Sequence, residues 1–363
     1  MKKPPTEFAA RRETFFAALR GHKLDAAIVS SPVNVRYLTG FTGSNSLLLA
    51  APGLTILYTD PRYATQVKTE ADSPHKQVVR GPLTPALADS LKKSRFRHVG
   101  FEASHLTYEE YDALAKSVPG RTRLAPLGGI LEQLRAVKSP PEIEKIRASV
   151  VLNSQAFAGA MASFRAGMTE RELAAEIDHQ MRLLGADAPA FDTIVASGVH
   201  AALPHARPEA RPIERNALLL IDMGAQAEGY ASDMTRMAFP GKPGPVVRSR
   251  YAAVLEAQRA AIAAVKPGVP AAEVDRAARK VLRRHGLDKR FIHSTGHGLG
   301  LEIHEAPRIG GNVDQALEAG MAITIEPGIY IEGWGGIRIE DTVLVTATGC
   351  EVLTPTPKEL LVL

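Results

Sequence analysis

Residues 217–238 read ALLLIDMGAQAEGYASDMTRMA, and this pattern decides how the second half of the chain folds. Two apolar runs flank the polar segment AQAEG, which is typical of an antiparallel hairpin. We place the centre of this hairpin between Ala227 and Glu228, which sets Asp222 opposite Asp233. Directly opposed residues face the same side of a sheet, with Cβ atoms about 5 Å apart. The stretch therefore predicts two facing carboxylates.

A second stretch repeats this arrangement further along the chain. Residues 322–345 read AITIEPGIYIEGWGGIRIEDTVLV, two apolar runs around a glycine-rich turn. With Gly333 at the centre, Glu326 and Glu340 are each seven residues away, so they are expected to face each other as well.

The four acids of these hairpins stand in apolar surroundings, such as LLLI before Asp222 and ITI before Glu326. Opposed like charges destabilise a sheet, and a buried charge is costly unless it is paired or bound to a metal. A single acid of this kind would be interpreted as salt-bridged or exposed. Four acids at matched positions in two hairpins favour a metal site.

A nitrogen ligand for this site is predicted at His297, in the glycine-rich segment STGHGLG, because glycines let the backbone approach a site closely. Four carboxylates and one imidazole form an oxygen-rich set that favours Mn²⁺, with Co²⁺ or Zn²⁺ as alternatives. Shared carboxylates would bridge two ions about 3.5–4 Å apart and acidify a water between them.

Two further histidines occupy similar contexts, His205 in LPH and His304 in IHE, 99 residues apart. This spacing is close to that of a weak internal repeat, in which FRAG ends at Gly167 and VKPG ends at Gly268, 101 residues later. We expect the two histidines to flank one cleft. Three others are expected to be ordinary surface or core histidines: His200, His285 and His293.

The first 130 or so residues alternate short apolar runs with helical patterns, which is typical of an α/β domain. The segment SPPE at 139–142 has the capping-box pattern of a helix start, with proline at the first helical position. We therefore predict a mixed α/β (α+β) chain with two domains, 1–132 and 133–363. The first domain is expected to contain strands at 26–29, 46–50 and 54–59 and helices at 7–19, 85–93 and 108–117.

Composition excludes several classes of protein. The 44 Lys and Arg against 39 Asp and Glu give a net charge of +5, and 45% hydrophobic residues argue against disorder. Cys350 is the only cysteine, so neither an internal disulfide nor a thiolate metal site is expected. No run approaches the roughly 18 apolar residues of a membrane span, and residues 1–13 do not resemble a signal peptide. We expect a cytoplasmic protein without membrane or nucleic-acid partners, because the basic helix at 276–285 is better explained by its dipole.

These residues resemble the pita-bread metallopeptidases, family M24, over essentially the whole chain. The motifs that carry the resemblance are DMG at 222–224, GYASDMTR at 229–236, GHGLG at 296–300, EPGIY at 326–330 and GIRIED at 336–341. The resemblance implies a smaller N-terminal α/β domain and a duplicated pita-bread catalytic domain.

The resemblance also implies residue roles. One metal would be held by Asp222, Asp233 and Glu340, and the other by Asp233, His297, Glu326 and Glu340, with Asp233 and Glu340 bridging. Glu326 would also accept the proton of the bridging water. His205 and His304 would position substrate and stabilise the transition state, and Arg338 would hold substrate beyond the scissile bond.

Within this family the long N-terminal domain and the RIED motif favour the Xaa-Pro peptidases over methionine aminopeptidases. Segments 34–44 and 59–63 resemble the N-terminal domain of the Xaa-Pro enzymes, and the second favours the aminopeptidase P type. We expect an aminopeptidase P-like exopeptidase acting on proline-containing peptides, as a homodimer. The alternatives are an Xaa-Pro dipeptidase (prolidase) and, more remotely, a non-catalytic pita-bread binding protein, which the retention of all five ligands disfavours.

Overall fold

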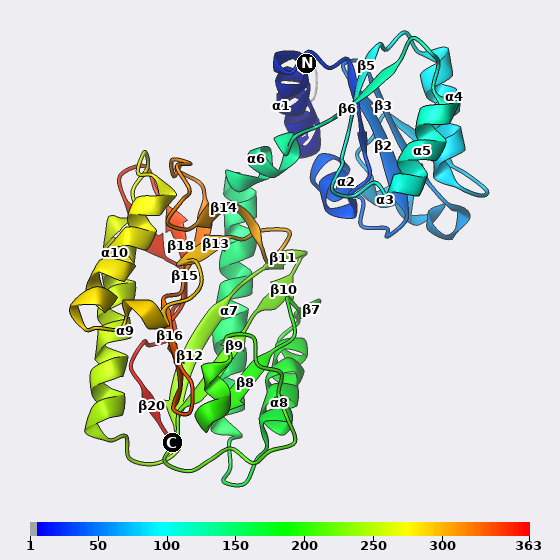
Figure 1. Ribbon diagram of the computed structural model, residues 1–363. Coiled ribbons are helices and arrows are strands. Elements are labelled where there is room, and N and C mark those ends of the chain that lie inside the picture. Colours follow the sequence, from blue (N-terminus) through cyan, green and yellow to red (C-terminus); the bar gives the residue numbers. More distant parts are fainter. Residues whose placement is uncertain (1–5) are drawn as a thin grey trace. The chain divides into compact units, whose positions relative to one another are not determined.

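The computed structural model describes residues 6–363, and the chain divides into two compact units, Met1–Leu134 and Arg135–Leu363 (Figure 1). Each unit combines helices with its own sheets, so the expected mixed α/β class is confirmed.

The first unit is built on one six-stranded sheet with the order β4-β3-β2-β1-β5-β6. The central strand β1 pairs antiparallel with β2 and parallel with β5. The three strands expected from apolar runs are confirmed, and three short strands that were not predicted complete the sheet. The strands are β1 (Ala26–Val29), β2 (Ser46–Ala51), β3 (Leu54–Thr59), β4 (His75–Val78), β5 (His98–Phe101) and β6 (Arg123–Pro126).

Buried apolar side chains of α4 and α5 pack on the sheet. On α4, for example, Leu87 and Leu91 are fully buried against β1, β2 and β5. The elements are α1 (Glu7–Gly21), α2 (Pro32–Thr39), the 3-10 helix η1 (Pro61–Tyr63), α3 (Gln66–Glu70), α4 (Leu83–Lys93) and α5 (Tyr108–Ser117). The helix α6 (Ile130–Ala136) follows across the division between the units.

The second unit contains two helix pairs, which confirm the internal repeat. Helix α7 (Pro140–Ala162) begins with the expected capping box of Ser139 and Glu142, and it pairs with α8 (Glu170–Leu183). The second pair is α9 (Pro245–Ala264) and α10 (Ala271–Arg284). Helices α8 and α10 each have 14 residues and begin 271 − 170 = 101 positions apart, the spacing of the repeat.

The strands of the second unit lie between these helix pairs (Figure 1). They form four small sheets with the orders β11-β10-β7, β20-β12-β9-β8, β14-β13-β15-β18-β19 and β16-β17. The short helix η2 (Gly198–Ala202) lies between β8 and β9, and η3 (Asp288–Arg290) lies between α10 and β13. The strands are β7 (Ala188–Pro189), β8 (Ile194–Ser197), β9 (Leu219–Met223), β10 (Ala225–Ala227), β11 (Tyr230–Ala231), β12 (Met234–Phe239), β13 (Gly296–Gly298), β14 (Glu305–Ile309), β15 (Ala322–Ile325), β16 (Gly328–Ile331), β17 (Gly335–Arg338), β18 (Asp341–Val345), β19 (Cys350–Val352) and β20 (Leu361–Val362).

The first hairpin forms, but its expected register is wrong, because Asp222 lies opposite Thr235 rather than Asp233. The turn is centred between Glu228 and Gly229, one position later than expected. Both residues have positive φ, 48° and 80°, as a two-residue type I′ turn requires. The error moves the partner of Asp222 by two residues, and side chains alternate with a period of two. The two aspartates therefore still face the same side.

The register of the second hairpin is as expected. Ile325 pairs with Asp341 in β15 and β18, and Gly328 pairs with Arg338 in β16 and β17. Glu326 and Glu340 lie between these two sets of pairs, equidistant from Gly333.

The apolar cores of the second unit lie on both sides of these hairpins. One buried cluster joins α9 and α10 to the second hairpin, and another joins α7 and α8 to the first. Among residues 6–363, no helix is long and apolar enough to cross a membrane.

Candidate active site

All eight residues singled out from the sequence line one cavity of about 700 Å³ in the second unit. This volume falls within the roughly 300–1,000 Å³ of small-molecule sites. The eight are Asp222, Asp233, His297, Glu326 and Glu340, expected as metal ligands, and His205, His304 and Arg338, expected to contact substrate.

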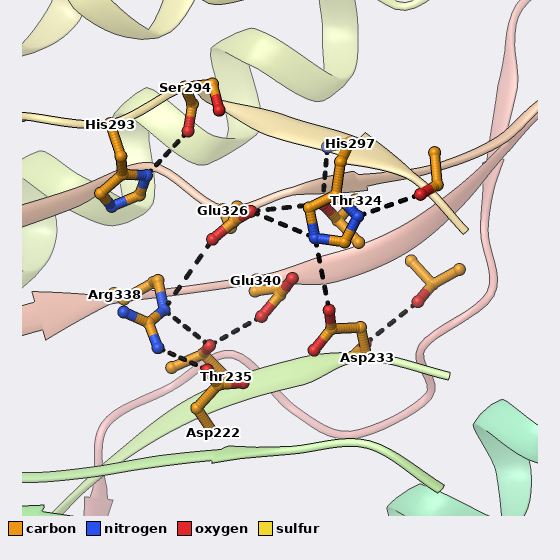
Figure 2. A network of polar contacts seen from close by, with 12 residues as sticks. Asp222, Asp233, Thr235, His293, Ser294, His297, Thr324, Glu326, Arg338 and Glu340 are labelled. Carbon is orange, nitrogen blue, oxygen red and sulfur yellow. Dashed lines mark hydrogen bonds and ion pairs between the residues drawn. The ribbon is translucent and has the colours of Figure 1, made fainter. Parts of the chain in front are cut away.

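The two hairpins and β13 deliver the five expected ligands. Asp222 lies on β9, Asp233 directly precedes β12, and Glu326 directly follows β15. Glu340 directly precedes β18, and His297 lies on β13, between β14 and β15. The side chains of Asp233, Glu326 and His297 point toward one another (Figure 2).

Strand β13 reaches this position because of its glycines. A Cβ on Gly296 would lie 1.9 Å from the Thr324 carbonyl oxygen, and one on Gly298 would lie 2.2 Å from that of Ala306. Only glycine allows such close packing of backbones, as the segment STGHGLG indicated. His297 is held between two strands and faces the carboxylates.

The ring of His297 is oriented for ligation. Its Nδ1 is 3.0 Å from the carbonyl oxygen of Gly298, to which it donates, so Nε2 presents its lone pair to the acids. Nε2 lies 3.5 Å from Asp233 Oδ2 and 3.6 Å from Glu326 Oε1. These are acceptors facing acceptors, an arrangement that a cation between them stabilises.

Two buried carboxylate oxygens support the same conclusion. Asp222 Oδ1 and Glu340 Oε1 have no hydrogen-bond partner among residues 6–363. One ligand atom each from Asp233, His297 and Glu340 lies within 4.8 Å of the others. Orphaned buried oxygens are costly, and converging oxygens with one imidazole match what a divalent cation prefers. The residues therefore fit a metal site.

The electrostatics of the acids reflect their crowding. Burial, and then the charges of neighbouring acids, raise the pKa of Asp233 and of Glu340 well above the ordinary carboxyl value. Burial raises the pKa of Glu326 to about 7. A raised carboxyl pKa favours the protonated form, so a bound cation competes with protons at Asp233, Glu326 and Glu340.

We therefore expect metal to stabilise the protein more as pH rises. A carboxyl with a raised pKa in the folded state binds protons more tightly folded than unfolded, so metal-free protein loses stability as pH rises from about 4.5 to about 7. Cation binding replaces those protons. Thermal unfolding of EDTA-treated and Mn²⁺-loaded protein between pH 5 and 8 should show a gap in Tm that widens with pH. A constant gap would contradict proton displacement.

Arg338 joins several site residues. It donates to Asp222 Oδ2 at 2.6 Å, to Thr235 Oγ1 at 2.9 Å and to the Tyr330 hydroxyl at 2.7 Å. Thr235 Oγ1 in turn donates to Glu340 Oε2 at 2.7 Å. Figure 2 shows this fully buried guanidinium beside the acids. Its donors are occupied by protein groups.

The three histidines that were expected to be ordinary surface or core residues lie in different surroundings. His200 is buried against Glu170, and His285 is exposed and pairs with Glu256, both as ordinary histidines would be. His293 is half-buried and lines the cavity, and its Nε2 lies 2.9 Å from the Tyr330 hydroxyl. Burial, and then the charge of Arg338, lower the pKa of His293 to about 4, so its imidazole is neutral at pH 7.

Comparison with known proteins bears on this geometry. Residues 144–347, more than half of the chain, match metallopeptidase family M24. The chain belongs to metallopeptidase family M24. Residues 11–137 match the creatinase/prolidase N-terminal domain. The resemblance, the duplicated pita-bread fold and the assignment as a peptidase are thus confirmed.

Relatives within M24 match nearly the whole chain. An Xaa-Pro dipeptidase of Pyrococcus furiosus is 37% identical over 353 residues, 97% of this chain and 99% of its own. The solved Xaa-Pro dipeptidase of Bacillus anthracis has a TM-score of 0.95 at 36% identity, covering 98% of this chain and 100% of that one. The solved X-Pro aminopeptidase of Thermotoga maritima has a TM-score of 0.89 at 36% identity, covering 96% and 100%.

Proposed function

We propose that this M24 enzyme is an Xaa-Pro dipeptidase, which hydrolyses the bond between a first residue and a C-terminal proline. The observation that carries the proposal is the position of Arg308. It pairs directly with His297 across β13 and β14, so the two side chains face the same side of the sheet. Arg308 is exposed and lines the cavity. A dipeptide bound with its scissile bond beside the metal ligands, His297 among them, has its free carboxylate one residue away, where this guanidinium can bind it.

The proposal reverses the order of the two functions expected from the sequence. The sequence favoured an aminopeptidase P type on the segment 59–63, with the dipeptidase as the alternative. The P. furiosus and B. anthracis relatives favour the dipeptidase. A second exposed arginine, Arg207, also lines the cavity and adds to its positive charge near the acids.

The chemistry of the prolyl peptide bond explains why a dedicated peptidase is needed to cleave it. The nitrogen of a prolyl peptide bond carries no hydrogen, so peptidases that bind that N–H fail at it. Two divalent cations, held by the five ligands as the resemblance implies and with Mn²⁺ preferred, would supply Lewis acidity and an acidified water.

The chain's own side chains then handle the proton and the developing charge. With a pKa raised toward neutrality, a Glu326 carboxylate oxygen can accept a proton and pass it to the leaving proline nitrogen. Partial burial lowers the pKa of His304, so its neutral imidazole can donate an N–H to the developing oxyanion. The His304 ring lies against that of His297, with centroids 4.4 Å apart. His205 lines the same cavity and would position the substrate. The homodimer and the cytoplasmic location stay predictions.

The test compares Ala-Pro with Ala-Pro-Ala, using Mn²⁺-loaded enzyme, an EDTA control and the variant Arg308→Ala. We expect the dipeptide to be preferred. A hydrogen bond to a charged group contributes about 1.5–3 kcal/mol, so Arg308→Ala should lower kcat/KM for the dipeptide about 10- to 100-fold and change that for the tripeptide little. Arg290→Ala, which removes an exposed arginine outside the cavity lining, is the matched control. Preference for the tripeptide would instead establish an aminopeptidase P.

A further inference from the structure

A loop comprising residues 198–209, which we call the His205 loop, forms one wall of the cavity. It contributes His205 and Arg207, together with Pro204, Ala206 and Pro208. Apart from η2 it has no regular structure, and Leu203 is 55% exposed beside His205. Something outside the loop must therefore hold His205 toward the cavity.

One buried carboxylate binds both ends of this loop. Glu170, the first residue of α8, is fully buried. Its Oε1 accepts from the Ser197 amide at 2.8 Å, just before the loop, and its Oε2 accepts from the Glu209 amide at 3.0 Å, at the loop's end. His200 Nδ1, within the loop, lies 2.9 Å from Oε2 and 3.0 Å from Oε1.

The charge of Glu170 suits this role. A buried carboxylate is tolerated only when several donors satisfy it, and here two donors belong to the loop, His200 and the Glu209 amide, and the third, the Ser197 amide, directly precedes it. Its place in the first turn of α8 adds a favourable interaction with the helix dipole. The middle of the loop is fixed separately, because Arg338 Nη1 donates to the Pro204 carbonyl oxygen at 3.2 Å.

We propose that Glu170 is a positioning residue, which acts through the His205 loop to hold His205 and Arg207 at the cavity. This inference rests on the proposed function, which assigns His205 the role of positioning the substrate. Glu170 itself does not line the cavity. Its effect on catalysis therefore passes through the loop.

The test is the variant Glu170→Gln, which keeps the shape of the side chain but puts an amide N–H₂ where the carboxylate accepts. Misplacement of a catalytic group by about 1 Å costs on the order of 10²-fold, so we expect kcat/KM on Ala-Pro to fall by about that factor with Mn²⁺ content unchanged. Hydrogen exchange should speed up at amides of residues 198–209 and not at those of 322–345. Glu176→Gln, on the same helix and bonded only to Gln180 among the described contacts, is the matched control and should behave like the parent.

A double-mutant cycle separates positioning from general stability. In a His205→Ala background, Glu170→Gln should cost much less than in the parent, because the group it positions is gone. Equal costs in both backgrounds, or faster exchange throughout the second unit, would overturn the proposal. If Glu170→Gln does not fold, Glu170→Asp serves, with a smaller loss of activity and the same localised exchange expected; parent-like exchange in the loop would contradict the proposal.

The two proposals fail differently. If the parent enzyme cleaves no Xaa-Pro peptide, the proposed function is wrong, while the exchange comparison still tests the anchoring of the loop. If the parent cleaves Ala-Pro and Glu170→Gln matches it in rate and exchange, only the present inference is wrong.

Discussion

The variant Asp233→Asn should lose both metal and activity, and should melt at a higher temperature than metal-free parent protein. Asp233 is nearly fully buried, and burial and neighbouring acids raise its pKa well above the ordinary carboxyl value. Burying a carboxyl whose pKa is raised costs free energy of folding at neutral pH, and a neutral amide carries no such cost, so the metal-free protein gains stability. The same change removes a ligand that the resemblance assigns to both ions. Since several kcal/mol of transition-state stabilisation come from such ions, kcat/KM should fall about 10³-fold or more.

Thermal unfolding with and without Mn²⁺ checks both halves of this result. A ligand at a hundredfold excess over its Kd stabilises a protein by about 2.7 kcal/mol, so the parent should gain in Tm and the variant should not. Asp178→Asn is the control, because this half-buried acid, bonded to Thr193 Oγ1 at 2.6 Å, lies outside the cavity lining and also has a raised pKa. Full metal content and activity in Asp233→Asn would show that the ligand assignment is wrong.

The hairpins show where sequence reasoning succeeds in this fold. The register around Gly333 is symmetric in the sequence, so the facing of Glu326 and Glu340 follows from counting alone. The other turn depends on Glu228, a residue that adopts positive φ despite its side chain. Composition gives no signal for such a residue, and the predicted register was wrong by one position at the turn. A shift of one position in the turn centre moves the cross-strand partner by two residues, so Asp222 and Asp233 still face the same side of the sheet.

Residues that act through distant contacts could not be found in this way. His293, which lies between η3 and β13, reaches the cavity because Tyr330 on β16 binds its ring. Glu170 resembles an ordinary acid in the first turn of a helix, and only the fold shows that it binds Ser197 and Glu209. No local sequence pattern indicates either contact. The short strands β4 and β6 were missed because their sequences, HKQV and RLAP, are polar or carry proline at the sheet edges.

Arg338 presents the sharpest difference between the role implied by resemblance and the geometry of this chain. The resemblance implies that Arg338 holds substrate beyond the scissile bond. In the structure its donors are bound to Asp222, Thr235, Tyr330 and the carbonyl of Pro204. These contacts make it the cation that holds Asp222 in place, and one that orders the His205 loop.

Arg338→Ala should therefore weaken metal binding together with substrate binding. Removing one partner of a buried ion pair costs about 3–5 kcal/mol, because the other charge is left unpaired, so a large fall in Tm is expected. Arg338→Lys keeps the charge but cannot form the planar fork. It should fold and bind Mn²⁺ more weakly than the parent. Its kcat should fall by a larger factor than its KM rises.

The matched control for Arg338 is Arg12→Ala in the first unit. Arg12 is also a buried arginine, paired with Asp72 at 3.0 Å and bonded to the Leu38 carbonyl oxygen at 2.8 Å. Its loss should lower Tm without changing the affinity of the folded protein for Mn²⁺. If Arg338→Lys raises KM alone, with Mn²⁺ affinity and Tm unchanged, the direct role in substrate binding is correct. If Mn²⁺ affinity and kcat fall together, Arg338 acts through Asp222, as its hydrogen bonds indicate.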